Sequence, residues 1–368
     1  MMKCEVAVIG AGPAGSIAAE ESAKDYDTVI FEEHKKQPVH CAGLISKTGF
    51  GRLGIPERDF ILNKIRGAKI FSPKGTCIEI SPKETKAFVV DRSAFDDYLL
   101  SKAVSSGAEY VNSRVDTVGG EFFHKKNKKI NAEKIILATG TDYKLQRAAG
   151  INTPKEFLFG AQYDMMVECE TDMVELHFIL PEFFAWIIPA GDFARVGLCA
   201  KKNAVQSLDA FVAKLNSSGR LKNQKISKKV FGTIPVYDPK LKTSGLGANT
   251  DINLVGDAAG HVKATTGGGI ILGGLAARHA ASEDYESEWK SEIGRELRLH
   301  LAMHRFLASL PDKKKDKLFS AVAKNHKTLE DSGDMDAASA TLGAILKNPR
   351  FAFDLLPFAP NLIKHMIL

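Results

Sequence analysis

The feature that most constrains the fold is the segment CEVAVIGAGPAG, at residues 4–15. Its first part, CEVAVIG (4–10), is a short apolar run rich in valine, which is typical of a buried parallel strand. The glycine-rich GAGPAG follows at once, and SIAAEESAK (16–24) favours a helix. A second buried strand, TVIF (28–31), then ends in two glutamates. Strand, glycine loop, helix, strand and acid, in this order, predict a dinucleotide-binding unit.

Each glycine of this loop has its own physical role. Gly10 permits the tight turn, Gly12 lets the backbone approach a pyrophosphate, and Gly15 allows the helix to pack closely on the strand. The helix then presents free N–H groups and a favourable dipole to the phosphates. Glu32 follows Gly10 by about 20 residues, the spacing at which an acid accepts hydrogen bonds from a ribose. Glu33 takes this role if the strand ends one residue later.

Segments further along the chain indicate which dinucleotide is bound. AFVVDRSAFDDYL (87–99) contains a strand and a helix around Asp91 and Arg92, and KIILATG (134–140) is another buried strand. INLVGDAAGHVKATTGGGIILGGL (252–275) combines a strand, a carboxylate turn, a triple-glycine loop and a helix of small residues. A nicotinamide domain needs no second phosphate-binding segment so far downstream, whereas a long flavin with a broad ring does. The chain therefore favours FAD over NAD.

Four blocks together resemble the geranylgeranyl reductase family of FAD-dependent flavoproteins, in its archaeal digeranylgeranylglycerophospholipid reductase type. They are GAGPAG, CAGLIS (41–46), Asp91–Arg92 with FDDYL (95–99), and GDAAG followed by TTGGGI (265–270). The resemblance covers spaced blocks within residues 1–281. It implies the fold of the para-hydroxybenzoate hydroxylase group, with FAD as the cofactor.

The resemblance also implies roles for individual residues. Arg92 would reach the pyrophosphate or ribityl region, Val115 would pack at the adenine, and Asp257 would bind ribityl or phosphate oxygens. N–H groups from Gly267 to Ile270 would face O2 and N1 of the flavin, where the reduced ring carries negative charge. The implied cofactor-binding residues are Gly10, Gly12, Pro13, Ala14, Gly15, Glu32, Glu33, Cys41, Ala42, Gly43, Arg92, Val115, Gly140, Gly256, Asp257, Gly267, Gly268, Gly269 and Ile270.

The CAGLIS segment corresponds to a loop that the family places over the flavin ring. Ala42 and Gly43 would let the backbone pass close to a flat surface. Cys41 would then be a neighbour of the flavin, and two interpretations of its thiol stay open. It packs there as a small polarizable residue, or it is a catalytic residue that donates a proton to the reacting alkene.

Residues 151–245 change in character to short strands with turn residues between them, which predicts an antiparallel sheet. In the family such a sheet covers the flavin and forms a wall of the substrate cavity. FFAWIIPAG (183–191) resembles the segment at that wall, so Phe184, Trp186 and Pro189 are predicted to line the substrate. Phe184 and Trp186 alternate along the strand and so share one face. An ordinary sheet core is the alternative.

These assignments predict an α/β fold, α+β as a whole, with a C-terminal helical part. The predicted domains are a discontinuous Rossmann-like FAD-binding domain (1–60, 85–150 and 245–284), an antiparallel-sheet substrate domain (61–84 and 151–244) and a C-terminal helical region (285–368). The tail FAFDLLPFAPNLIKHMIL (351–368) is apolar, but it is interrupted by Pro357 and Pro360 and is too short to span a bilayer. It docks on a membrane, roofs a lipid tunnel, or packs on its own protein.

Charge and cysteine content restrict the partners and the compartment. The net charge is +6, and basic residues come in short runs, HKKNKKI (124–130) and DKKKDK (312–317), which are typical of solvated surfaces and do not favour nucleic acid. The five scattered cysteines form no metal-ligand pattern and suit a reducing compartment. No signal peptide or membrane span is present, which predicts a cytoplasmic protein, with peripheral contact at a membrane surface as an alternative.

The leading functional hypothesis is an FAD-dependent reductase that saturates isoprenoid (geranylgeranyl) double bonds of lipids or prenyl diphosphates. Its electron donor, a reduced nicotinamide or a ferredoxin-like protein, is open. A flavin monooxygenase or halogenase is the first alternative, although FFAWIIP has only one of the two tryptophans of the halogenase WxWxIP pattern. A non-catalytic flavin- or lipid-binding relative is the second, since Thr139 and Ala264 depart from the family pattern. His261 is a candidate acid, with a structural role as the favoured interpretation.

Overall fold

The structure is a computed structural model that describes residues 2–35, 39–118, 122–124, 128–247 and 250–367. The chain divides into two compact units, each assembled from segments that are far apart in the sequence. The first unit comprises Met1–Val39, Arg92–Phe157 and Ile234–Leu297, and the second comprises His40–Asp91, Leu158–Thr233 and Arg298–Leu368.

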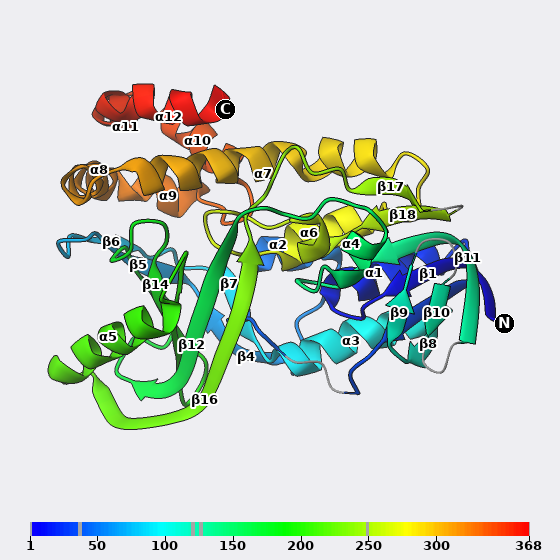
Figure 1. Ribbon diagram of the computed structural model, residues 1–368. Coiled ribbons are helices and arrows are strands. Elements are labelled where there is room, and N and C mark those ends of the chain that lie inside the picture. Colours follow the sequence, from blue (N-terminus) through cyan, green and yellow to red (C-terminus); the bar gives the residue numbers. More distant parts are fainter. Residues whose placement is uncertain (1, 36–38, 119–121, 125–127, 248–249, 368) are drawn as a thin grey trace. The chain divides into compact units, whose positions relative to one another are not determined.

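The first unit is built on a mainly parallel sheet with the strand order β17, β18, β11, β1, β2, β8 (Figure 1). The strands from β18 to β8 run parallel to their neighbours, while β17 is antiparallel to β18 and the β9–β10 pair extends from β11. The strands are β1 (Met2–Ile9), β2 (Thr28–Glu32), β8 (Glu109–Asn112), β9 (Val115–Thr117), β10 (Phe122–His124), β11 (Lys128–Leu137), β17 (Ser244–Gly247) and β18 (Thr250–Leu254).

Helices cover this sheet closely because the contacting residues are small. Helix α1 (Pro13–Ser22) buries Ser16, Ala18 and Ala19 and packs against both α3 (Arg92–Ser105) and α6 (Ile270–Ala277). The remaining elements of the unit are α4 (Lys144–Ala148), the 3-10 helix η1 (Gly256–Ala259) and the first part of α7 (Tyr285–Ser309). The central strands β1 and β2 are buried on both sides, as a strand between two layers requires.

The second unit contains a mainly antiparallel sheet with the order β16, β12, β15, β14, β13, β5, β6. Its strands are β5 (Gly67–Phe71), β6 (Cys77–Ile80), β12 (Phe157–Val167), β13 (Met173–His177), β14 (Ala185–Pro189), β15 (Ala194–Ala200) and β16 (Leu221–Pro235). Helix α5 (Ala204–Ser217) packs on it through Leu208, Phe211 and Leu215, which lie on one face at helical spacing. A smaller sheet consists of β3 (Leu44–Ser46), β7 (Ala87–Val90) and β4 (Ile61–Ile65), in this order. Helix α2 (Lys47–Leu53) follows β3 in the chain.

The second unit ends in a group of helices. They are α8 (Asp312–Lys324), α9 (His326–Ser332), α10 (Ala338–Lys347), α11 (Pro349–Leu355), the 3-10 helix η2 (Leu356–Phe358) and α12 (Ala359–Ile367). Their core contains Phe306 from α7, Leu310 just after that helix, and Leu318 from α8. Among the described residues, no helix combines the length and the apolar composition that a bilayer crossing requires.

The predicted fold class is confirmed: a Rossmann-like parallel sheet, an antiparallel sheet and C-terminal helices are all present. The unit boundaries differ from the predicted domain boundaries. Residues 40–60 and 85–91 lie in the second unit, because β7 pairs there with β3 on one side and with β4 on the other. Residues 285–297 lie in the first unit, where the buried Tyr285 hydroxyl donates to the Leu254 carbonyl at 2.5 Å. The assignment of a function to each domain stays a prediction.

Candidate functional site

The turn from β1 into α1 accepts only glycine at two positions, one in the loop and one in the first turn of the helix. Gly10 has a φ of +101°, and a Cβ there would stand 2.4 Å from the carbonyl oxygen of Ala138. A Cβ on Gly15 would stand 1.9 Å from the carbonyl oxygen of Gly10. Both obstacles are backbone atoms, so a side chain at either position would displace the helix. Glycine therefore lets α1 begin directly against the ends of β1 and β11.

The start of α1 offers a site for an anion. Gly12 precedes Pro13, the first helical residue, and no side chain caps the N–H groups of the first turn. Proline suits the first helical position because it has no N–H that would be left without a partner. The amides of Ala14 and Gly15 lie in the first turn, where no helix carbonyl precedes them to accept their hydrogen bonds. These amides and the helix dipole together favour a phosphate group.

Glu32, at the end of β2, is the acid that faces the glycine loop. Its carboxylate accepts a hydrogen bond from the amide of Ala11 at 3.0 Å and another from the amide of His34 at 2.9 Å. The Glu32 residue is only 8% exposed. Glu33 points elsewhere, within ion-pair distance of Arg114 at 3.7 Å. The register of β2 therefore favours Glu32 over Glu33 as the ligand of a ribose.

The GDAAG turn after β18 lies against the glycine loop, although more than 200 residues separate them in the sequence. Gly256 has a φ of +63°, and a Cβ there would stand 2.8 Å from the Cβ of Ala14. Asp257 follows in η1, and one of its carboxylate oxygens lies 2.8 Å from the position of a Cβ on Gly269. The two glycine-rich segments thus meet, with the Asp257 carboxylate at the beginning of α6.

The triple-glycine loop has fewer available amides than the sequence predicts. The Gly267 N–H donates to the Lys263 carbonyl at 2.8 Å, and the Gly268 N–H makes a longer bond of 3.4 Å to a threonine hydroxyl of the same loop. Gly269 and Ile270 cap and begin α6, where first-turn amides have no carbonyl one turn earlier. Of the four N–H groups expected to face the flavin, those of Gly269 and Ile270 are therefore the two that stay available.

Arg92 and Asp257 are electrostatically coupled. The Arg92 guanidinium forms a two-pronged ion pair with Asp96, with N–O distances of 3.0 and 2.9 Å, at the start of α3. Burial raises the pKa of Asp257 to about 6, and the charge of Arg92 acts in the opposite direction. An arginine held in this way supplies a fixed positive charge in the unit, which suits a pyrophosphate or a ribityl oxygen.

A buried lysine next to the triple-glycine loop was not predicted as a site residue. Lys263 is 3% exposed, and its Nζ lies 3.3 Å from the position of a Cβ on Gly268. Buried lysines are rare because desolvation disfavours their charge. A sequence signal was present, since Lys263 is the one charged side chain between Asp257 and Arg278. The tertiary structure places this charge beside the glycine backbone.

His261 is packed as a neutral residue. It is fully buried, and neither ring nitrogen has a hydrogen-bond partner among the described residues. Burial lowers the pKa of His261 to about 3, against the effect of Glu286, and its ring lies 4.5 Å from that of Trp289. An imidazole that stays uncharged at neutral pH has no proton of ordinary acidity to donate, so the structure favours the structural interpretation.

Val115 and Gly140 occupy positions of different kinds. Val115, in β9, is 6% exposed and belongs to the sheet core together with Ile130. Gly140 has a φ of +60°, and a Cβ there would meet nothing within 4 Å. The backbone conformation of the turn, rather than crowding, therefore requires glycine. Thr139, which departs from the family pattern, donates its hydroxyl to the Asp142 carbonyl at 2.8 Å and closes the same turn.

Cys41, Ala42 and Gly43 lie in the second unit. Gly43 has a φ of +69°, and its amide donates to the Cys41 sulfur at 3.3 Å. The Ala42 carbonyl accepts a hydrogen bond from Arg195 at 2.6 Å, which holds the loop in place. Within the described residues, no group of three or more histidine, cysteine, aspartate or glutamate side chains could hold a metal ion.

The predicted substrate-lining residues also lie in the second unit. The rings of Phe184 and Trp186 meet edge to face with centroids 6.5 Å apart. The Trp186 indole covers Gly197, where a Cβ would stand 2.5 Å from Cζ2, and it shares an apolar cluster with Ala42. Pro189 ends β14 and is buried. The structure therefore brings the CAGLIS segment and the tryptophan strand together within one unit.

Three comparisons place this chain among known proteins. It is 32% identical over 367 residues to the digeranylgeranylglycerophospholipid reductase of Methanocaldococcus jannaschii, covering 87% of this chain and 91% of the relative. A geranylgeranyl bacteriochlorophyll reductase-like protein from Thermoplasma acidophilum has a TM-score of 0.80 and 26% identity, covering 97% of this chain and 100% of that one. A halogenase variant in complex with FAD has a TM-score of 0.64 at 14% identity, covering 99% and 96%. No family model matches the chain.

The glycine-built loop, the acid at the end of β2 and the parallel sheet are arranged as in a Rossmann-like unit, and the chain has the fold of flavin-dependent enzymes. A pyrophosphate fits the first unit because no side chain caps the first-turn amides of α1, whose N-terminus offers N–H groups and a favourable dipole to an anion. The sequence identity goes further: the chain belongs to the digeranylgeranylglycerophospholipid reductase family. The family that the sequence motifs indicated is thereby confirmed.

Proposed function

We propose that this protein is an FAD-dependent reductase that saturates isoprenoid double bonds of geranylgeranyl lipids. The observation that carries the proposal is the similarity to a named digeranylgeranylglycerophospholipid reductase along nearly the whole chain. The meeting of the two glycine-rich segments, through Gly256 and Ala14, supports it independently. Two such segments suit one extended ligand with a pyrophosphate and a ring at its end.

In this proposal the first unit holds FAD. The amides of Ala14 and Gly15 bind the pyrophosphate, and Glu32 accepts hydrogen bonds from the adenosine ribose. Arg92 and Asp257 contact phosphate or ribityl oxygens. The amides of Gly269 and Ile270 face the pyrimidine part of the ring, while the roles of Val115 and Gly140 stay predictions. When bound, the flavin supplies a hydride equivalent to one alkene carbon.

Lys263 has an electrostatic role in this proposal. Its ammonium group lies beside the Gly268 backbone, at the loop whose neighbours Gly269 and Ile270 are assigned to the flavin ring. A fixed positive charge in a site with little water stabilises negative charge that develops nearby. Lys263 therefore favours the reduced, anionic state of the cofactor and adds to the dipole of α6.

Two further roles in the proposal belong to the second unit. Phe184, Trp186 and Pro189 offer apolar surface to the prenyl chain, because an isolated alkene has no charge to bind and each buried methylene contributes about 0.8 kcal/mol. The Cys41 Sγ holds the proton that completes the reduction at the second alkene carbon. Packing without proton transfer is the alternative for Cys41. The electron donor, a reduced nicotinamide or a ferredoxin-like protein, stays a prediction.

Anaerobic turnover tests the proposal directly. The purified protein is chemically reduced, mixed with digeranylgeranylglycerophospholipid, and the products are analysed by mass spectrometry. Mass gains in steps of two hydrogens support a reductase. An unchanged lipid from a protein that binds and reduces FAD would contradict it. Rapid oxygen consumption with an aromatic substrate would then favour the monooxygenase or halogenase alternative, and its absence would favour a non-catalytic flavin protein.

A further inference from the structure

Large apolar side chains are exposed at the end of the second unit. The four most exposed among the described residues are Phe353 at 72%, Leu346 at 68%, Leu356 at 57% and Ile363 at 52%. All four lie within a stretch of 18 residues in α10, α11, η2 and α12, and Met366 follows at 47%. Single exposed apolar residues are normal on protein surfaces, whereas a group of the most exposed ones in adjoining helices is not.

The same helices have a separate inward face. Leu355, Phe358 and Leu362 pack on the cluster formed by α7 and α8. Phe353 and Leu356 are three residues apart, and so are Ile363 and Met366, so each pair shares one side of its helical segment. The exposed apolar residues therefore form a second face, separate from the inward residues that attach the helices to the unit.

Positive charge borders this apolar face. Between residues 338 and 368 the sequence contains Lys347, Arg350 and Lys364, and Asp354 is its one acidic residue. The Asp354 carboxylate accepts a hydrogen bond from Asn325 at 2.9 Å. Exposed apolar side chains flanked by lysine and arginine are typical of helices that lie in the interface of a membrane.

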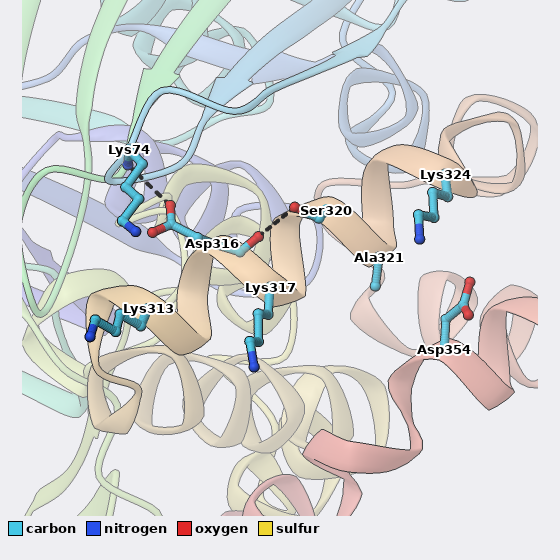
Figure 2. Close-up of a pocket in the computed structure, with 8 residues that line it drawn as sticks. All are labelled: Lys74, Lys313, Asp316, Lys317, Ser320, Ala321, Lys324 and Asp354. Carbon is cyan, nitrogen blue, oxygen red and sulfur yellow. Dashed lines mark hydrogen bonds between the residues drawn. The ribbon is translucent and has the colours of Figure 1, made fainter.

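A lysine-lined groove adjoins these helices. The groove has a volume of about 510 Å³ and is lined by Lys74, Lys313, Asp316, Lys317, Ser320, Ala321, Lys324 and Asp354 (Figure 2). Lys313, Lys317 and Lys324 are spaced so that they follow one side of α8, and Asp354 comes from α11, which packs against α8. The groove is thus continuous with the element that carries Phe353.

One carboxylate oxygen of Asp316 in the groove is engaged, while the other, Oδ2, is buried without a hydrogen-bond partner among the described residues. Asp316 accepts hydrogen bonds from the Ser72 hydroxyl at 2.6 Å and the Lys74 amide at 3.0 Å, which attaches the β5–β6 turn to α8. Among the described residues, Lys313, Lys317 and Lys324 form no ion pair. Lys315 of the same basic run is different, because it is 1% exposed and donates to the Pro181 carbonyl at 2.9 Å. Its burial corrects the expectation that the whole run is solvated.

We propose that this C-terminal surface, comprising the lysine groove and the exposed apolar face of α10–α12, docks on an anionic lipid bilayer. The apolar side chains enter the interfacial layer, and the lysines contact lipid phosphates. A protein partner fits less well, since the centres of protein interfaces are depleted in lysine. The proposal concerns attachment to the membrane and stands independently of the reductase activity.

Vesicle flotation of the full-length protein tests the proposal. Vesicles of 30% phosphatidylglycerol in phosphatidylcholine are compared with vesicles of phosphatidylcholine alone. We expect the wild type to float with the anionic vesicles and to be released largely by 0.5 M salt. The combined change Lys313→Gln, Lys317→Gln, Lys324→Gln lowers the partition coefficient by about tenfold or more. Its matched control is Lys222→Gln, Lys225→Gln, Lys228→Gln, which removes the same charge from exposed positions on β16.

The apolar face is tested by Phe353→Ser with Leu356→Ser, which lowers binding by a similar factor. Leu62→Ser with Val205→Ser is the control, because these exposed residues lie elsewhere in the second unit. Circular dichroism checks that each variant is folded. A wild type that does not float, or variants that bind as their controls do, would overturn the proposal. So would a dimer in sedimentation equilibrium that Phe353→Ser with Leu356→Ser dissociates without any vesicle binding.

Discussion

The Asp257 carboxylate lies directly over Gly269, with one oxygen 2.8 Å from the point where a Cβ on that glycine would stand. One residue follows β18 and the other caps α6, so this approach holds the carboxylate turn at the N-terminus of a helix. A carboxylate at that place benefits from the helix dipole. The same approach leaves no room for a side chain at Gly269 unless the Asp257 carboxylate moves, although the backbone conformation of this glycine is open to any residue.

Gly269→Ala is expected to impair FAD binding more than folding. The new methyl group displaces the Asp257 carboxylate, which can rotate, so the loss of stability is only about 1 kcal/mol. The dissociation constant of FAD rises by about tenfold, as the carboxylate and the start of α6 no longer fit the cofactor. Fluorescence titration with FAD and urea unfolding measure the two effects. Gly51→Ala is the control, because a Cβ there meets nothing within 4 Å; an equal effect of both changes would contradict the prediction.

The stability of the apoprotein is expected to depend on Asp257 between about pH 4 and pH 6. Burial raises the pKa of its carboxyl from 3.8 to about 6, so the folded state binds a proton that the unfolded state has released. The contribution of the Asp257 carboxyl to the free energy of unfolding is therefore present in full below about pH 4, and it is lost as the pH rises through 6. The difference in the free energy of unfolding between the wild type and Asp257→Asn, measured with urea at each pH, isolates this contribution. A difference that does not change with pH would refute the assignment, and the exposed Asp25→Asn serves as the control for the loss of a carboxylate.

Lys263→Met is expected to make the reduction potential of bound FAD more negative. Without the buried ammonium group, the anionic reduced flavin loses a stabilising charge, and the two-electron potential falls by about 30 mV or more, equivalent to about 1.4 kcal/mol. Spectroelectrochemical titration gives the value. Lys263→Arg retains the charge and restores most of the potential, while Lys144→Met removes an exposed lysine of the same unit. An unaltered potential in Lys263→Met would show that the lysine is structural.

Cys41→Ala is expected to slow alkene reduction while FAD binding stays unchanged. If the thiol donates the proton, its removal lowers the single-turnover rate by about 100-fold. The rate is followed by mass spectrometry of the lipid under anaerobic conditions, with FAD content from absorbance. Cys77→Ala is the matched control, since this cysteine is exposed in the same unit. A wild-type rate in Cys41→Ala would leave the packing role for this residue.

The sequence by itself determined the β1–loop–α1–β2 unit, the fold class and the family. These follow from local patterns: valine-rich strands, glycines where backbone crowding forbids a side chain, and an acid at a set distance. Gly10 and Gly15 could be assigned in this way because the motif itself sets their positions, although the atom that crowds Gly10 belongs to Ala138, directly after β11.

Only the tertiary structure decided which groups from distant segments meet. The choice of Glu32 over Glu33 depends on the register of β2, and the raised pKa of Asp257 depends on the burial of its carboxyl at the start of α6. Lys263 stands out in the sequence as a lone charge, but its burial arises from packing, since a charge in a loop is usually solvated. The exposed face around Phe353 also required the structure, because an apolar tail has the same local pattern whether it packs inward or faces outward.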